Sequence, residues 1–121
     1  MQIIQAGLSH KTAPVEIREL LALPDLPAAL RTLCPDNGHC PGYALEGAIL
    51  STCNRLEIYA VVEDAGRGQQ DLRDFLAAVS DTPRSVFEAY LQAHEGEAAI
   101  THVCDVACGL DSMVLGESQI Q

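Results

Sequence analysis

The chain has 121 residues, of which 48% are hydrophobic and 4% aromatic, and its formal net charge at pH 7 is −10. This length suits one domain with an aliphatic core, and the acidic balance argues against a free-standing nucleic-acid-binding protein, which normally presents a basic face. No apolar run reaches the roughly 18 residues of a transmembrane helix, and the N-terminus lacks the basic region of a secretory signal.

The first third of the chain predicts one strand followed by two helices. A strand is expected over residues 3–8, and Thr12 is a candidate N-cap for a helix that runs to about Leu23. Pro24 stops this helix, and a shorter helix is expected over residues 26–33.

The middle of the chain predicts a surface loop, a strand pair and a helix. Residues 36–43 are rich in turn-forming side chains, which indicates a loop. Two apolar runs follow at 48–50 and 58–62, and we expect them to pair as adjacent antiparallel strands. The segment 66–68 then separates the second run from a helix over about 69–79, where apolar residues recur at helical spacing.

The last part predicts a fourth strand at 90–94 and a helix from Glu97 to about Val106. The order of strands and helices is that of a ferredoxin-like split βαβ arrangement. The predicted class is therefore α+β, a ferredoxin-like sandwich with an antiparallel sheet, helices on one face and a C-terminal helix. We divide the chain into a core at 1–95 and a segment at 96–121, which we expect to continue into a longer protein.

The segment with the most chemical content is Ser-Thr-Cys-Asn-Arg-Leu-Glu at 51–57, between the two paired strands. Cys53 is a candidate nucleophile in its thiolate form, and Arg55 can stabilise a thiolate or hold an anionic substrate. The residue types alone leave two other interpretations open: a small buried structural thiol at Cys53, and an exposed Arg55 paired with Glu57.

Three segments together resemble glutamyl-tRNA reductase, the enzyme that begins tetrapyrrole (heme) synthesis from charged tRNA. They are GLSHKTAPV at 7–15, STCNRLEIY at 51–59 and GLDSMVLGESQI at 109–120. The resemblance covers the N-terminal catalytic domain of that family and makes residues 1–95 its catalytic core. The family's NADPH-binding and dimerisation domains are absent from this chain. Because the sequence has no Gly-x-Gly-x-x-Gly stretch, we do not expect it to bind NADPH itself.

The resemblance implies chemistry in two steps at Cys53. The cysteine attacks the ester that joins glutamate to tRNA, and hydride from NADPH then reduces the thioester to glutamate-1-semialdehyde. His102 matches the family's active-site histidine and would assist proton transfer or activate the thiol. The resemblance also implies these substrate-binding positions, with Arg55 on the glutamate carboxylate: Thr52, Arg55, Asn54, Ser112, Glu117 and Gln119. It further implies glutamyl-tRNA as substrate and a homodimer formed through the absent C-terminal domain. His10 and Lys11 lie in a family loop that approaches the site, and they receive no role in chemistry.

The other cysteines support an alternative function, a non-enzymatic thiol-rich regulatory or metal-binding module of the same fold. A cysteine hydrolase is a third hypothesis. The candidate clusters are Cys34, His39 and Cys40, and His102, Cys104 and Cys108. Neither has the spacing of common zinc modules, so no metal is expected, and we interpret Cys104 and Cys108 as small core or interface residues. Five cysteines, an odd number, argue against a disulfide framework and favour a cytoplasmic protein with reduced thiols.

Overall fold

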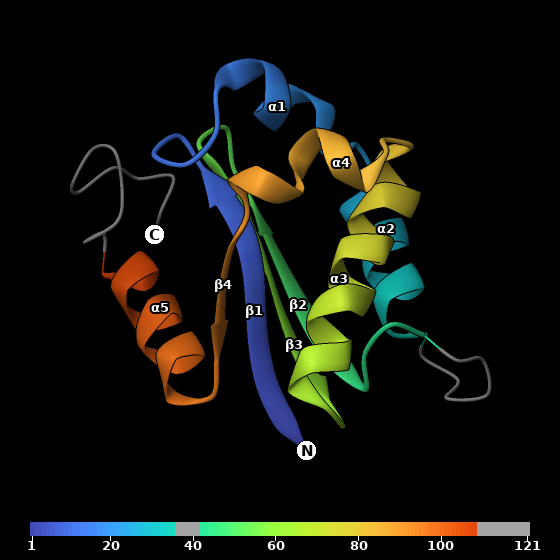
Figure 1. Ribbon diagram of the computed structural model, residues 1–121, viewed down its shortest axis with the longest axis vertical. Coiled ribbons are helices and arrows are strands. Elements are labelled where there is room, and N and C mark those ends of the chain that lie inside the picture. The colour runs from blue at the N-terminus through green and yellow to red at the C-terminus, as the bar shows by residue number, and fades with distance from the viewer. Residues whose placement is uncertain (36–41, 109–121) are drawn as a thin grey trace.

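A computed structural model describes residues 1–35 and 42–108 of the chain. Within them, four strands form one antiparallel sheet in the order β2-β3-β1-β4 (Figure 1). The strands are β1 (Gln2–Ser9), β2 (Glu46–Ser51), β3 (Arg55–Val62) and β4 (Gln92–Glu95). The predicted α+β class is therefore confirmed, and so is the antiparallel pairing of the two strands that flank Cys53.

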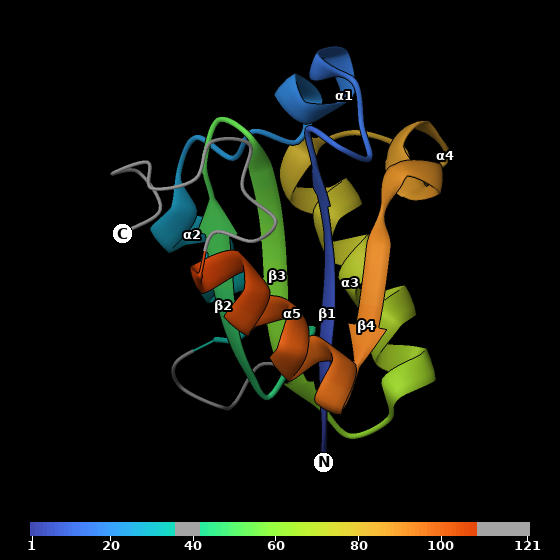
Figure 2. The same cartoon turned by 90° about the vertical axis from the view of Figure 1, so that its left-hand side faces the viewer.

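Helices cover both faces of this sheet and one of its ends. They are, in chain order, α1 (Val15–Leu20), α2 (Leu26–Leu33), α3 (Ala65–Ser80), α4 (Arg84–Phe87), the 3-10 turn η1 (Glu88–Tyr90) and α5 (Glu97–Ala107). Helices α2 and α3 form the expected layer on one face, whereas α5 covers the opposite face and α1 lies beyond the strand ends (Figures 1 and 2). None of the helices in the described ranges is long and apolar enough to cross a membrane.

The two central strands send their apolar side chains toward α2 and α3, where they form the core. These side chains are Ile4, Ala6 and Leu8 of β1, Leu56, Ile58, Ala60 and Val62 of β3, and Leu72, Phe75 and Leu76 of α3. Because successive residues of a strand point to opposite faces, the residues between them point toward α5. Several of these are polar and nevertheless buried, namely Gln5, Ser9, Arg55 and Glu57.

The prediction for α1 is wrong at both ends. Thr12 does not cap the helix, because its Oγ1 instead accepts a hydrogen bond from the backbone N–H of Ser9 at 3.0 Å. Pro14 occupies the N-cap position without a side-chain hydrogen bond. The helix ends at Leu20 rather than near Leu23, and Leu21 beyond it is buried in the core.

Two later boundaries also differ from the prediction. Helix α3 begins at Ala65, not near residue 69, because the Asp64 side chain accepts a hydrogen bond from Arg67 N–H at 2.8 Å and caps the helix ahead of its two glycines. Tyr90 belongs to the 3-10 turn, so β4 begins two residues later, at Gln92.

Gly68 allows α3 to pack closely against the sheet. A Cβ atom added at Gly68 would lie 2.8 Å from Cγ2 of Val62 and 3.0 Å from Cδ1 of Ile4. At Gly66, on the same helix, the nearest atom to an added Cβ would be Asp64 Oδ2 at 3.7 Å. The two glycines therefore differ in packing although they share a helix.

We expect Gly68→Ala to lower the free energy of unfolding by about 1–3 kcal/mol, because the stiff Val62 side chain must shift. Gly66→Ala should leave that free energy unchanged or raise it by up to about 1 kcal/mol through helix propensity. Urea unfolding of both variants measures the difference, and equal effects would contradict the packing role of Gly68.

Candidate active site

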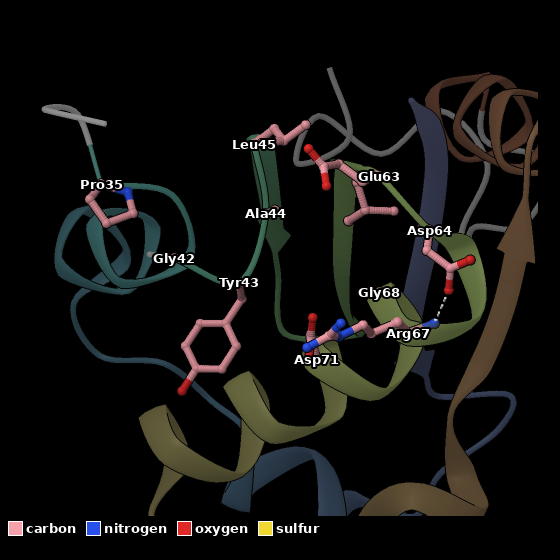
Figure 3. A pocket seen from close by; sticks show the side chains of 11 residues that line it. Pro35, Gly42, Tyr43, Ala44, Leu45, Glu63, Asp64, Arg67, Gly68 and Asp71 are labelled. Atoms are coloured by element: carbon pink, nitrogen blue, oxygen red, sulfur yellow. Dashed lines mark hydrogen bonds between the residues drawn. The ribbon is translucent and has the colours of Figure 1, made fainter. Parts of the chain in front are cut away.

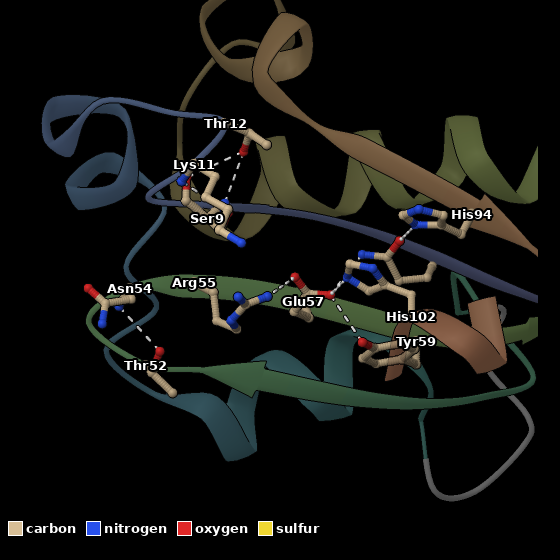
Figure 4. A network of polar contacts seen from close by, with 11 residues as sticks. Ser9, Lys11, Thr12, Thr52, Asn54, Arg55, Glu57, Tyr59, His94 and His102 are labelled. Atoms are coloured by element: carbon tan, nitrogen blue, oxygen red, sulfur yellow. Dashed lines mark hydrogen bonds and ion pairs between the residues drawn. The ribbon is translucent and has the colours of Figure 1, made fainter. Parts of the chain in front are cut away.

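Cys53 lies in the turn that joins β2 to β3, and its side chain is exposed. The backbone N–H of Thr52 closes the turn by donating to the carbonyl oxygen of Arg55 at 2.9 Å. The hydroxyl of Thr52 accepts a hydrogen bond from Asn54 N–H at 3.2 Å (Figure 4). The interpretation of Cys53 as a buried structural thiol is therefore wrong, and the thiol is accessible to a reactant.

Two segments from the start of the chain contact this turn. The backbone N–H of His10 donates to the carbonyl oxygen of Asn54 at 2.8 Å. Nη1 of Arg18, on α1, donates to the carbonyl oxygen of Cys53 at 3.1 Å. The loop that contains His10 therefore does approach the candidate site, as expected, and it does so through its backbone.

A cavity of about 340 Å³ opens beside the turn. It is lined by Thr52, Cys53, Arg55 and Arg18 together with apolar residues of α1, of the segment after it and of the strands, including Leu8, Val15, Leu21 and Leu56. A concave, largely apolar site with a few polar groups is typical of small-ligand binding.

A second cavity, of about 500 Å³, lies near the other end of β3, beside the start of α3 (Figure 3). Tyr43, Glu63, Asp64, Arg67 and Asp71 are among the residues that line it. The sequence assigns none of these residues to a site, and Asp64 is already engaged as the cap of α3. We therefore take the cavity beside Cys53 as the candidate active site.

Glu57 is the centre of a buried polar network on the α5 side of the sheet (Figure 4). The residue is 2% exposed, and its Oε2 accepts a hydrogen bond from Arg55 Nη1 at 3.0 Å. Its Oε1 accepts from Gln5 Nε2 at 2.9 Å and from the Tyr59 hydroxyl at 3.1 Å, and lies 2.8 Å from Nε2 of His102. Both carboxylate oxygens are therefore engaged, Oε1 by three partners and Oε2 by one.

This network fixes the tautomers of two histidines. An ionised Glu57 beside Arg55 only accepts hydrogen bonds, so His102 carries a proton on Nε2, and Nδ1 is the nitrogen that can accept a proton in the neutral ring. Gln5 donates to Glu57 through Nε2, so its Oε1 is an acceptor, and Nδ1 of His94, 2.6 Å away, is the donor. The two imidazole rings stack with their centroids 4.4 Å apart.

Comparisons with known proteins identify the family of the chain. A family model described as "Glutamyl-tRNAGlu reductase, N-terminal domain" matches residues 6–121. This chain belongs to that family. Proteins named glutamyl-tRNA reductase from Chloroflexus aurantiacus and Geobacillus kaustophilus are both 48% identical to it, over 100% and 99% of this chain.

The family members are much longer than this chain. It covers 28% of the Chloroflexus aurantiacus protein and 26% of the Geobacillus kaustophilus protein. The solved structure "Glutamyl-tRNA Reductase from Methanopyrus kandleri" has a TM-score of 0.64 and 26% identity, over 98% of this chain and 25% of that one. The chain therefore spans about a quarter of the length of these relatives.

The structure describes only some of the residues that the resemblance assigns. Thr52, Cys53 and Arg55 lie together at the cavity, Asn54 lies in the same turn, and His102 lies on α5 against Glu57. Arg55 pairs with Glu57, as one interpretation anticipated, but it is buried rather than exposed. The remaining assigned positions lie outside the described residues: Ser112, Glu117 and Gln119.

The structure describes only some of the residues of the two candidate cysteine clusters. Cys104 on α5 and Cys108 just beyond its end are exposed, so they are not core residues, and their interpretation as interface residues stays a prediction. His39 and Cys40 lie outside the described residues. Across residues 1–35 and 42–108, no group of three His, Cys, Asp or Glu side chains is arranged to hold a metal ion.

Sequence reasoning missed the partners that hold Glu57 and the Cys53 turn. Gln5 stands in the middle of an apolar strand, and Tyr59 follows Glu57 at strand spacing, so both carried a signal for one polar face. Arg18 and His94 carried none, because their contacts form only when distant segments meet.

We expect strong energetic coupling between Arg55 and Glu57, because each compensates the buried charge of the other. Removing one partner of a buried pair typically costs about 3–5 kcal/mol. Arg55→Met and Glu57→Gln should each destabilise the fold to this degree, and the double variant should lose about 0.5–3 kcal/mol less than the sum. Urea unfolding of the four proteins measures the coupling.

The surface pair of Arg84 with Asp74, 2.8 Å apart, provides the control for this cycle. Hydrogen bonds to Asp74 and then Glu88 raise the pKa of Arg84, but solvent screens exposed pairs. We expect no comparable coupling there. Additive effects at Arg55 and Glu57 would show that their ion pair does not organise the network.

Proposed function

We propose that this chain is the catalytic N-terminal domain of a glutamyl-tRNA reductase and that Cys53 accepts the glutamyl group. The Cys53 thiolate attacks the carbonyl carbon of the ester that joins glutamate to tRNA. A carbon–sulfur bond forms, the carbon–oxygen bond to the ribose breaks, and the ribose oxygen leaves with a proton. Splitting one difficult transfer into two easier steps is the usual gain of covalent catalysis.

In the second step, hydride from NADPH adds to the thioester carbon. The carbon–sulfur bond then breaks, which releases glutamate-1-semialdehyde, NADP⁺ and the Cys53 thiolate. We assign NADPH to another domain of the full-length enzyme, because this sequence lacks a dinucleotide-binding glycine motif. The proposed product is the first intermediate committed to tetrapyrrole synthesis.

The accessible position of Cys53 carries this proposal. Within the described residues, Cys53 is an exposed cysteine whose cavity is also lined by Thr52, Arg18 and Arg55. A nucleophile needs both access and neighbours that bind the reacting group, and loops on a rigid scaffold supply both. Cys104 on α5 and Cys108 just beyond its end are exposed but do not line this cavity, and Cys34 is only partly exposed and lines a different one.

We assign proton transfer to His102. Its Nε2–H is held by Glu57, so Nδ1 is the nitrogen that can accept and return a proton. Glu57 also binds Arg55, which lines the cavity, and so connects the cavity with the histidine. This arrangement supports a role for Glu57 in orienting His102, as carboxylates commonly do for catalytic imidazoles.

The remaining substrate contacts follow from the residues beside the cavity. Arg55 is proposed to bind the glutamate carboxylate, since a guanidinium matches a carboxylate in shape and charge. Thr52 is proposed to donate a hydrogen bond near the reacting carbonyl, and Asn54 is retained as a substrate-binding position. Ser112, Glu117 and Gln119 of the third motif are retained as proposed substrate-binding positions.

The acidic charge of the chain suggests that other domains make most of the contacts to the tRNA phosphates. With a net charge of −10, this part is poorly suited to binding many phosphates. We propose that it binds the aminoacylated end of the tRNA, while other domains of a cytoplasmic homodimer bind most of the tRNA backbone. The proposal includes a ferredoxin-like topology, which is supported by the position of β3 between β1 and β2.

Cys53→Ser should abolish the covalent intermediate. On mixing with glutamyl-tRNA and no NADPH, we expect the wild-type enzyme to gain the mass of one glutamyl group that hydroxylamine removes. The serine variant should gain none, because its hydroxyl is a far weaker nucleophile than a thiolate. Intact-mass spectrometry reads the result, and an adduct on the variant would exclude Cys53 as the acyl acceptor.

His102→Gln should slow the release of tRNA without unfolding the protein. The amide can still donate to Glu57, but it cannot transfer a proton, and such groups typically contribute about 10²–10⁴-fold in rate. Deacylation of labelled glutamyl-tRNA measures the rate, and urea unfolding checks stability. A rate equal to wild type would rule out proton transfer by His102.

A further inference from the structure

We propose that Arg18 is a positioning residue for Cys53: by holding the carbonyl oxygen of the nucleophile's own residue, it orients the thiol in the cavity. This inference rests on the proposed function, in which Cys53 is the acyl acceptor. No sequence motif pointed to Arg18, which lies on α1, 35 residues before Cys53 along the chain.

The turn is held by a separate contact at each of its three residues. Thr52 N–H donates to the carbonyl oxygen of Arg55 within the turn, at 2.9 Å, and the carbonyl oxygen of Asn54 accepts from His10 N–H at 2.8 Å. The carbonyl oxygen of Cys53 accepts from Arg18 Nη1 at 3.1 Å. The carbonyl oxygen of Cys53 is therefore held by a side chain from a distant helix, while the carbonyl oxygen of Asn54 is held by a backbone N–H.

Arg18 makes this contact at an energetic cost. It lines the mostly apolar cavity, and its Nε atom is buried with no hydrogen-bond partner in the described part of the chain. A buried polar group without a partner costs about 1–3 kcal/mol. Such unsatisfied groups are rare in folded proteins and call for an explanation, which a functional role for Arg18 supplies.

The position of α1 makes Arg18 a firm support although the helix lies at the surface. No residue of α1 itself is buried. The residues that flank the helix are its anchors, because Ala13 is 4% exposed and Leu21 is 1% exposed. Arg18 lies between these anchors, so movement of its backbone is restricted at both ends.

The expected effect is on the rate of acyl transfer rather than on binding. A misplacement of about 1 Å can lower a rate by about 10²-fold. We expect Arg18→Met to slow glutamylation of Cys53 at saturating glutamyl-tRNA by about 100-fold, while the concentration for half-saturation changes by less than about threefold. Arg18→Lys, which keeps one donor and the charge, should recover part of this loss.

The experiment uses the full-length enzyme that carries this domain, without NADPH. Rapid quenching and intact-mass spectrometry follow the glutamyl adduct of wild type, Arg18→Met, Arg18→Lys and the matched control Arg31→Met. Arg31 is an exposed arginine on α2 and should have no effect. Urea unfolding reports whether each variant is folded, and alkylation of Cys53 by iodoacetamide reports whether the thiol is accessible. If Arg18→Met does not fold, the comparison of Arg18→Lys with wild type decides the test.

Two results would overturn the inference while leaving the proposed function intact. One is a wild-type rate of glutamylation in a folded Arg18→Met. The other comes from a parallel reaction with glutaminyl-tRNA. If the substitution slows acylation of Cys53 by glutamyl-tRNA alone, Arg18 binds the substrate carboxylate instead. A positioning residue must slow both donors alike. Absence of any adduct on the wild-type enzyme would instead contradict the proposed function, and the role of Arg18 with it.

Discussion

The buried carboxylate of Glu57 is the constraint on which the α5 side of this protein depends. A charge at 2% exposure is tolerated only when it is fully bonded, and Glu57 reaches that state through partners on three elements. Gln5 comes from β1, Arg55 and Tyr59 from β3, and His102 from α5. Satisfying one carboxylate therefore sets the position of α5 against the sheet and the orientation of His102, which links the stability of the fold to its proposed chemistry.

The two faces of the sheet have different roles, because successive side chains of each strand point to opposite faces. The α2–α3 face is a continuous aliphatic core completed by Phe75 and Phe87, and it supplies most of the burial that stabilises the chain. The opposite face holds the polar network, whose hydrogen bonds contribute geometry more than net stability. Because both faces share β1 and β3, the network is held on a rigid support, as a preorganised site requires.

The contacts around Cys53 explain why residues near the N-terminus matter to a turn in the middle of the chain. His10 and Arg18 reach the turn only because β1 lies beside β3 in antiparallel register, with Ser9 opposite Arg55. That register brings the end of β1 to the beginning of β3. The first segment of the resemblance therefore supports the second physically, because His10 holds the backbone of Asn54 next to Cys53.

The sequence by itself determined the elements, since apolar periodicity and Pro24 mark most of them, and it determined the family through three motifs. It also singled out Cys53, because a cysteine close to a threonine and an arginine in the connection between two strands is a candidate nucleophile. The burial of Arg55, the contacts of Glu57 with Gln5 and His102 and the contact from Arg18 were decided by the tertiary structure alone. Each depends on side chains far apart in sequence that meet through strand register and helix placement. Local patterns carry no information on such meetings, because they encode which face a residue occupies and not what covers it.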